Sequence, residues 1–177
     1  AALGGVETRV GGQIHADSVA YLMRQPLWID DAIAPYTSGR DLYNGQGRVW
    51  LTGHADGFNS TGGIGIADSS ERSIGTVAGA TARIDRRTAT YANIGYNSGT
   101  VASADASASV GSIMGGIGGR YGISTLEAGP YVMARVNTGW IDYRSKRPLG
   151  SGLGTATGDT DGAAYNGMAG TGYVMRV

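Results

Sequence analysis

From residue 48 onward, hydrophobic and polar residues alternate with a period of two. In the segment 48–58, Val49, Leu51 and Ala55 fall on one side, whereas Trp50 and His54 fall on the other. Successive side chains of a β-strand point to opposite faces of a sheet, so this pattern predicts a strand with one apolar and one polar face.

The alternation recurs along the chain and predicts about six strands, at residues 48–58, 74–85, 89–98, 110–123, 126–140 and 165–177. Between them we expect long polar loops at 59–73, 99–109 and 144–163, and short turns at 86–87 and 124–125. Alternating long and short connections are typical of transmembrane barrels, and about ten residues suffice for a tilted strand to cross a bilayer. The predicted fold class is therefore all-β, an antiparallel up-and-down meander of a transmembrane β-barrel.

The first 45 residues follow a different pattern and are expected to form an N-terminal helical or linker segment, with the barrel strands occupying 46–177. Apolar residues recur at three- and four-residue spacing within 18–25, which predicts a short helix capped by Asp17 or Ser18. Pro26 should end or kink this helix, and Pro35 should begin a loop.

Composition favours a membrane barrel over a soluble sandwich. The chain contains 32 Gly but only one Phe, and small residues are poor material for a dense core. The 10 Tyr and 3 Trp combine an apolar ring with a polar tip, which suits a membrane–water interface. A soluble extracellular β-domain, acting as an adhesin or binding module, remains the alternative. It predicts that Val132 and Val136 are buried in a core.

Charge and sequence motifs indicate a protein without catalytic chemistry. Lys plus Arg and Asp plus Glu both number 14, so nucleic acid is not an expected partner. No G-x-S-x-G elbow accompanies His54, so no catalytic residue is assigned. The segment 158–162 (GDTDG) is interpreted as a surface turn because the further ligands of a calcium loop are missing, and neither a metal nor a cofactor is expected. The sequence contains no apolar stretch long enough for a transmembrane helix, and no signal peptide is expected.

The polar faces of the predicted strands carry charged residues that would line the lumen of a barrel, although a solvated sheet face would carry charges as well. The lumen-lining candidates are His54, Asp56, Arg83, Asp85, Arg120, Glu127 and Arg135. Trp140 and Tyr143 lie near a predicted strand end and are candidates for an aromatic girdle.

Three groups of residues resemble the C-terminal translocator domain of bacterial autotransporters, in particular the GDSL-type esterase autotransporters. These are the paired segments 76–85 (TVAGATARID) and 90–97 (TYANIGYN), the segment 140–143 (WIDY) followed by Lys146 and Arg147, and the GDTDG segment. The resemblance covers about 130 residues, from Arg48 to Val177.

The resemblance implies a type V secretion translocator in the bacterial outer membrane. Such a domain has twelve strands and a helix that plugs the pore, and it anchors an N-terminal passenger, here an esterase, at the cell surface. Its expected partners are outer-membrane lipid, its own passenger and linker helix, and the barrel-assembly machinery. Because about six strands are visible and a terminal aromatic strand is not, we expect a fragment covering roughly the first half of the barrel.

Overall fold

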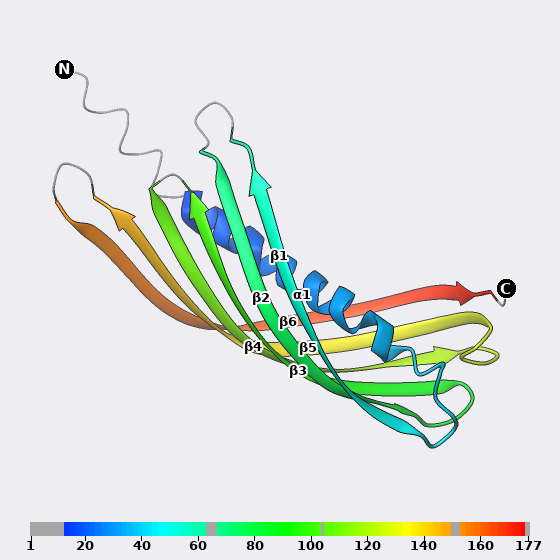
Figure 1. Ribbon diagram of the computed structural model, residues 1–177. Helices are drawn as coiled ribbons and strands as arrows, with labels where there is room; N and C mark the ends of the chain where they lie inside the picture. Colours follow the sequence, from blue (N-terminus) through cyan, green and yellow to red (C-terminus); the bar gives the residue numbers. More distant parts are fainter. Residues whose placement is uncertain (1–12, 63–66, 104, 150–152, 176–177) are drawn as a thin grey trace.

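A single curved antiparallel sheet with one helix on its concave face forms the molecule, as the computed structural model describes it (Figure 1). The structure describes residues 13–62, 67–103, 105–149 and 153–175. The elements are α1 (Gln13–Thr37), β1 (Gly47–Ser60), β2 (Ser69–Arg83), β3 (Thr88–Ser103), β4 (Ala106–Gly122), β5 (Gly129–Pro148) and β6 (Thr155–Val174).

Each strand pairs antiparallel with the next, so the sheet order is β1-β2-β3-β4-β5-β6, with β1 and β6 at its edges. This confirms the predicted meander of six strands behind an N-terminal helix. The connections 84–87 and 123–128 lie at one end of the sheet, which we call the turn end. The last residues of β1, β3 and β5 and the first residues of β2, β4 and β6 lie at the other end, which we call the loop end.

The predicted alternation of loop lengths is wrong. The strands have 14 to 20 residues and extend into the segments that the sequence indicated as long loops. The clearest case is the expected loop 99–109: β3 continues to Ser103 and β4 begins at Ala106. Small and polar residues predict a loop by composition, but here they pair in a ladder in which Val101 opposes Ala108.

The helix is also longer than predicted. α1 continues through Pro26 and Pro35, and Ser18 lies inside it, where its hydroxyl donates to the Ile14 carbonyl at 2.6 Å. Pro26 lacks an N–H and so removes one intrahelical hydrogen bond. Packing of one helix face on the sheet offsets this loss, so the helix does not end at Pro26 as expected. Because the helix already begins at Gln13, Asp17 and Ser18 lie inside it and are not the expected caps.

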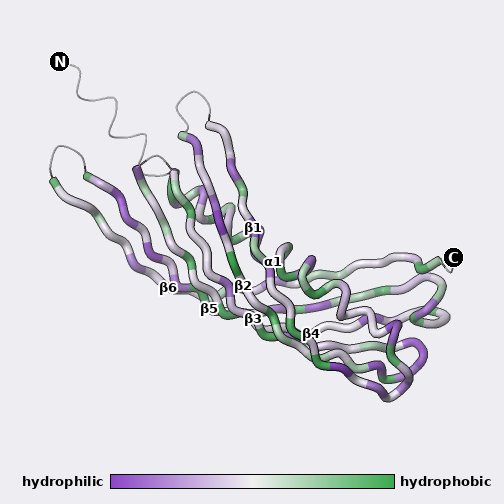
Figure 2. The backbone as a smooth tube through the Cα atoms, in the orientation of Figure 1, coloured by the Kyte–Doolittle hydropathy of each residue, from purple (hydrophilic) through white to green (hydrophobic). Residues whose placement is uncertain are grey.

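Hydrophobic and hydrophilic residues alternate along the strands (Figure 2). Within the described residues, no helix has both the length and the hydropathy needed to cross a bilayer.

Candidate functional site

The concave face of the sheet carries α1, whose first turn lies at the loop end and whose last turn lies at the turn end. Gln13 at the start of the helix bonds residue 67, in the connection between β1 and β2, through its side-chain oxygen and nitrogen. The residues that α1 buries recur every three or four positions and therefore form one stripe. They are Ile14, Ser18, Tyr21, Gln25, Ile29 and Ile33.

Two apolar clusters hold the helix on the sheet. Near the loop end, Ile14 and Tyr21 pack against four small or branched residues of β3 and β4, which are Val101, Ala106, Ala108 and Val110. Nearer the turn end, Ile29 and Ile33 pack against Trp50, Val77 and Met114. The small residues of β3 and β4 thus obtain their packing from the helix.

Polar contacts lie between and beside these clusters. The Tyr21 hydroxyl accepts a hydrogen bond from Asn97 Nδ2 at 2.9 Å, and Asn97 Oδ1 lies 3.0 Å from His54 Nε2. Ser112 donates to Gln25 Oε1 at 3.2 Å. His54 therefore belongs, through Asn97, to the network that positions the helix. Its partner is an amide and not a nucleophile, so this contact does not indicate catalysis.

Two ion pairs connect the helix to strands on its two sides. Arg24 pairs with Glu71 of β2, and the Glu71 side chain is 5% exposed. The Arg24 guanidinium lies over the Phe58 ring. Arg135 of β5, 4% exposed, pairs with Asp30. Each pair places a buried charge of the sheet next to an opposite charge of the helix, which is the arrangement a buried charge requires.

The end of the helix is fixed to β1 and β2. The Tyr36 ring stacks on Trp50 with centroids 5.3 Å apart, and the Tyr36 carbonyl accepts hydrogen bonds from Thr81 and Arg48, both at 2.8 Å. Thr81 in turn accepts from Trp50 Nε1 at 3.0 Å. This network ties the exit of α1 to the first two strands.

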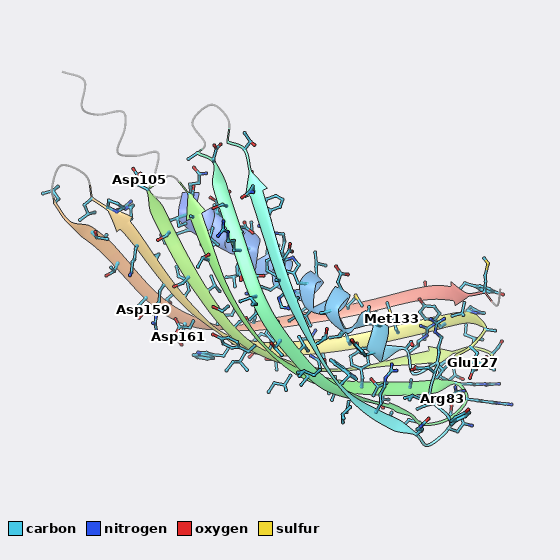
Figure 3. All side chains as sticks on the ribbon, viewed as in Figure 1. Arg83, Asp105, Glu127, Met133, Asp159 and Asp161 are labelled. Atoms are coloured by element: carbon cyan, nitrogen blue, oxygen red, sulfur yellow. The ribbon has the colours of Figure 1, made fainter. Side chains whose placement is uncertain are left out.

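A second buried cation lies at the turn end. Arg83 donates to the carbonyls of Leu42 at 2.9 Å and Asp85 at 3.1 Å and pairs with Glu127. Figure 3 shows Arg83 and Glu127 together at this end of the sheet. The hydrogen bond from Arg83 lowers the pKa of Glu127 below its usual value.

The residues predicted to line a lumen do not all lie in one place. His54, Arg83, Arg120 and Arg135 are on the concave face, whereas Asp56 follows the same alternation but is exposed on the edge strand β1. Arg120 stacks over the Tyr131 ring, 3.4 Å from its centroid.

Two of the predicted lumen residues lie outside the strands. Glu127 is in the connection between β4 and β5. Asp85 is in the turn between β2 and β3, where the backbone N–H groups of Arg87 and Thr88 donate to its carboxylate. The Arg87 N–H is the main reason that the pKa of Asp85 lies below its ordinary value.

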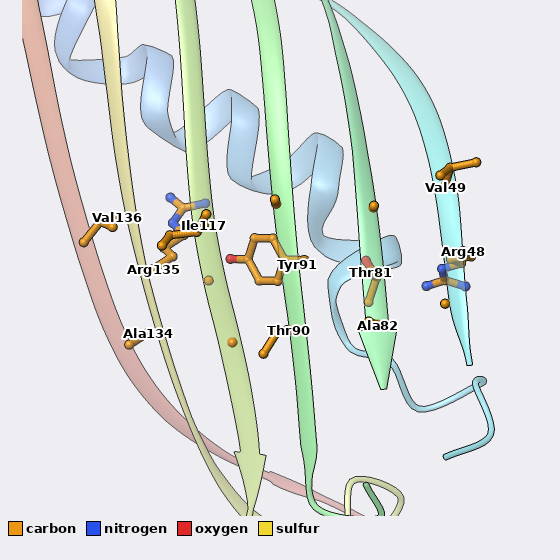
Figure 4. A pocket seen from close by; sticks show the side chains of 15 residues that line it. Arg48, Val49, Thr81, Ala82, Thr90, Tyr91, Ile117, Ala134, Arg135 and Val136 are labelled. Carbon is orange, nitrogen blue, oxygen red and sulfur yellow. The ribbon is translucent and has the colours of Figure 1, made fainter. Parts of the chain in front are cut away.

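The convex face carries an apolar belt. One cross-strand row runs through all six strands and contains only apolar or small side chains, namely Val49, Ala80, Ala92, Ile117, Val136 and Gly167. Val49, Ile117 and Val136 are 85%, 63% and 58% exposed. A broad, open depression of about 1050 Å³ crosses this belt between residues that include Val49, Ile117 and Val136 (Figure 4). Because this depression is open and its lining is mainly apolar, it is not a substrate pocket.

The two girdle candidates lie on opposite faces. Trp140 is 56% exposed on the convex face, in a row with Tyr96 and Ile113. Tyr143 faces the helix, and its hydroxyl lies 3.0 Å from His15 Nδ1. The position of Tyr143 therefore departs from the expected girdle.

The GDTDG segment is part of β6 and is not the surface turn that the sequence predicted. Asp159 opposes Arg144, and Asp161 opposes Asp142. Arg144 lies 3.1 Å from Asp142 and 3.8 Å from Asp159, so it partly neutralises this acidic group. The described part of the chain contains no group of acidic, His or Cys side chains that could hold a metal ion.

An apolar convex face, a polar concave face and a helix inside are the features of an outer-membrane barrel segment. The family model described as autotransporter beta-domain matches residues 49–177. The chain belongs to the autotransporter beta-domain family. No curated protein matches the chain.

Membership places this autotransporter domain in the bacterial outer membrane as a β-barrel translocator of type V secretion, associated with its own passenger. The family is one of translocators and not of enzymes. The helix residues that contact the sheet were not among the sequence candidates. The three- and four-residue spacing of Ile14, Ser18, Tyr21 and Gln25 indicates the helix face that contacts the sheet. The same spacing includes Ile29 and Ile33 only if the helix is continued past Pro26.

Proposed function

We propose that this autotransporter domain forms the first half of a closed barrel and anchors an N-terminal esterase passenger at the cell surface, with α1 in the lumen. The course of α1 carries the proposal: it begins at the loop end, runs along the polar face, and ends at the turn end beside the start of β1. A chain segment preceding α1 would thus leave the lumen at the loop end, where a surface passenger belongs.

A further observation supports the barrel. β1 and β6 leave their outer backbone edges unpaired within the described sheet, and unpaired edges are avoided when strands close into a barrel. The lumen-lining roles of His54, Arg83, Arg120 and Arg135 follow from the same arrangement, as does a girdle role for Trp140. Contact with outer-membrane lipid and with the barrel-assembly machinery belongs to the same proposal.

The soluble alternative predicts that Val132 and Val136 are core residues, but they are 44% and 58% exposed. Detergent dependence is the direct test. We expect the purified chain to be folded and monodisperse only in micelles or vesicles. Folded, monodisperse protein in plain buffer would rule out the barrel and favour an adhesin-like module.

The passenger has a separate test. Intact cells that display the full-length gene product are supplied with a short-chain p-nitrophenyl ester and compared with cells that display the same product without its passenger. We expect hydrolysis by the former only. Surface display without hydrolysis would refute the esterase passenger and leave the translocator role intact.

A further inference from the structure

Three asparagines lie in one cross-strand row of the concave face. Asn93 of β3 opposes Gly116, Gly116 opposes Asn137 of β5, and Asn137 opposes Asn166 of β6. Gly116 is required here, because a Cβ at this position would clash with Asn137 Oδ1. The row therefore presents three carboxamides on neighbouring or next-neighbouring strands.

These carboxamides are buried but not fully bonded. Asn93 and Asn137 are 8% and 6% exposed. Asn93 Oδ1, Asn137 Nδ2 and Asn166 Oδ1 are buried atoms without a hydrogen-bond partner among the described residues. A buried polar group without a partner is unfavourable and is rare in native structures.

α1 contacts the sheet on either side of this row and does not bond the three unpaired amide atoms. On one side of the amide row lies the row of Met114, which packs with Ile29 and Ile33. On the other side lies the row of Arg135, which pairs with Asp30. Asn97, which lies two residues along β3 from the partner of Val77, bonds both Tyr21 and His54. The chain thus has an asparagine that serves helix docking, and the amide row does not match that role.

We propose that the amide row binds the passenger polypeptide in extended form while it passes through the lumen, before α1 occupies this face. The proposal rests on the translocator function proposed above. A carboxamide offers a donor and an acceptor, as a peptide group does, and carries no charge. It can therefore bond the backbone of an extended segment of any sequence, which suits a surface that a whole passenger must move across.

Photo-crosslinking in the full-length precursor tests the proposal. A photoreactive phenylalanine replaces Asn137 or Asn93 in separate variants, and the adducts are followed through a pulse-chase. We expect passenger adducts at early times and α1 adducts once the passenger is exported. Val136, the convex-face neighbour of Asn137, is the matched control position and should give no passenger adduct.

Two outcomes would overturn the proposal. One is export of the passenger without adducts at either asparagine position, and the other is equal yields at Val136; both leave the translocator function standing. If the passenger of the unsubstituted protein never reaches the surface, the proposed function fails and this inference fails with it.

Alanine variants supply an independent measurement. Asn93→Ala with Asn137→Ala is expected to slow export by about two- to tenfold for each lost hydrogen bond, while α1 stays protected from protease in the exported state. Asn97→Ala should instead expose α1, because it removes the bond to Tyr21. Unchanged export with loss of α1 protection in the double variant would show that the amides serve helix docking, and would refute the proposal.

Discussion

On the concave face, several glycines lie directly opposite a large side chain of the neighbouring strand. The pairs are Trp50 with Gly79, His54 with Gly75, Tyr91 with Gly118 and Tyr131 with Gly172. At each of these glycines an added Cβ would clash with the opposing ring. A large residue that lies over a glycine covers its exposed backbone and keeps the cross-strand contact, so these four glycines reflect packing and not disorder.

Gly99→Ala tests this packing where it involves the helix. A Cβ there would clash with the Tyr21 hydroxyl and lie 2.9 Å from the Arg72 carbonyl. We expect a loss of about 1–3 kcal/mol in the free energy of unfolding, measured by urea denaturation in vesicles.

Gly111→Ala is the matched control, because a Cβ at Gly111 meets nothing within 4 Å. It should be neutral or slightly stabilising. Equal destabilisation by both variants would mean that the close approach of Tyr21 to Gly99 has no energetic role.

Glu127 links stability to pH. Arg83 lowers its pKa in the folded state, so the carboxylate contributes stability above its unfolded pKa of about 4.3, and this contribution is lost as the pH falls through the folded value. Glu127→Gln should therefore destabilise the barrel at pH 7 and flatten the acid limb of its stability profile. An unchanged acid limb in urea titrations from pH 7 to pH 3 would contradict this.

At the scale of elements, α1 combines weak intrinsic helix propensity with strong docking. Pro26 and Pro35 both lie inside it, and its buried stripe spans Ile14 to Ile33. Isolated helices depend on propensity, whereas helices in proteins obtain most of their stability from packing one face. The two ion pairs and two apolar clusters supply that packing here, so α1 needs the sheet in order to persist.

Asp30→Asn tests the docking of α1 by leaving Arg135 without its carboxylate. An unpaired charge that is 4% exposed is costly, about 3 kcal/mol or more. We expect increased conductance of the closed barrel in planar bilayers and faster proteolysis of α1.

Asp31→Asn, at the exposed neighbouring position, is the control and should leave both measurements unchanged. The exchange of Asp30→Arg with Arg135→Asp should restore them in part. If Asp31→Asn has the same effect as Asp30→Asn, the effect is one of net charge and not of the ion pair.

At the scale of the whole molecule, the strands exceed what a bilayer requires. β5 and β6 each have 20 residues, whereas about ten cross a tilted path. Near the loop end, the convex rows become polar, as in the row that contains Arg72, Thr100, Ser109, Arg144 and Asp159. The apolar belt thus occupies part of the strand length, and the loop end projects beyond it.

Val136→Arg tests which part of the convex face meets lipid. Arginine at the middle of a lipid-facing belt costs about 2–4 kcal/mol, and about 0–1 kcal/mol near the interface. We expect Val136→Arg to reduce folding into vesicles strongly, measured by heat-modifiable gel migration.

Ser107→Arg, on an exposed polar position near the loop end, should fold as the unsubstituted protein does. Equal folding of both variants would place Val136 outside the bilayer.

The sequence by itself determined the class of fold, the number of strands and which side chains share a face, because a period of two depends only on local strand geometry. It did so clearly at Val49, Leu51 and Trp50, where neighbours differ strongly in hydropathy. It failed at residues 99–109, where the residues are small on both faces.

Only the tertiary structure decided where the strands and the helix end. Residues 99–103 and 106–109 are strand because Ile14 and Tyr21 pack over them, and α1 passes Pro26 because the sheet holds both sides of the proline. Likewise, Tyr143 faces the helix, and Asp85 accepts hydrogen bonds from the backbone of a turn. The types of these residues alone do not predict either position. Local pattern specifies alternation, whereas the length of an element depends on partners distant in the chain, and these exist only once the fold has formed.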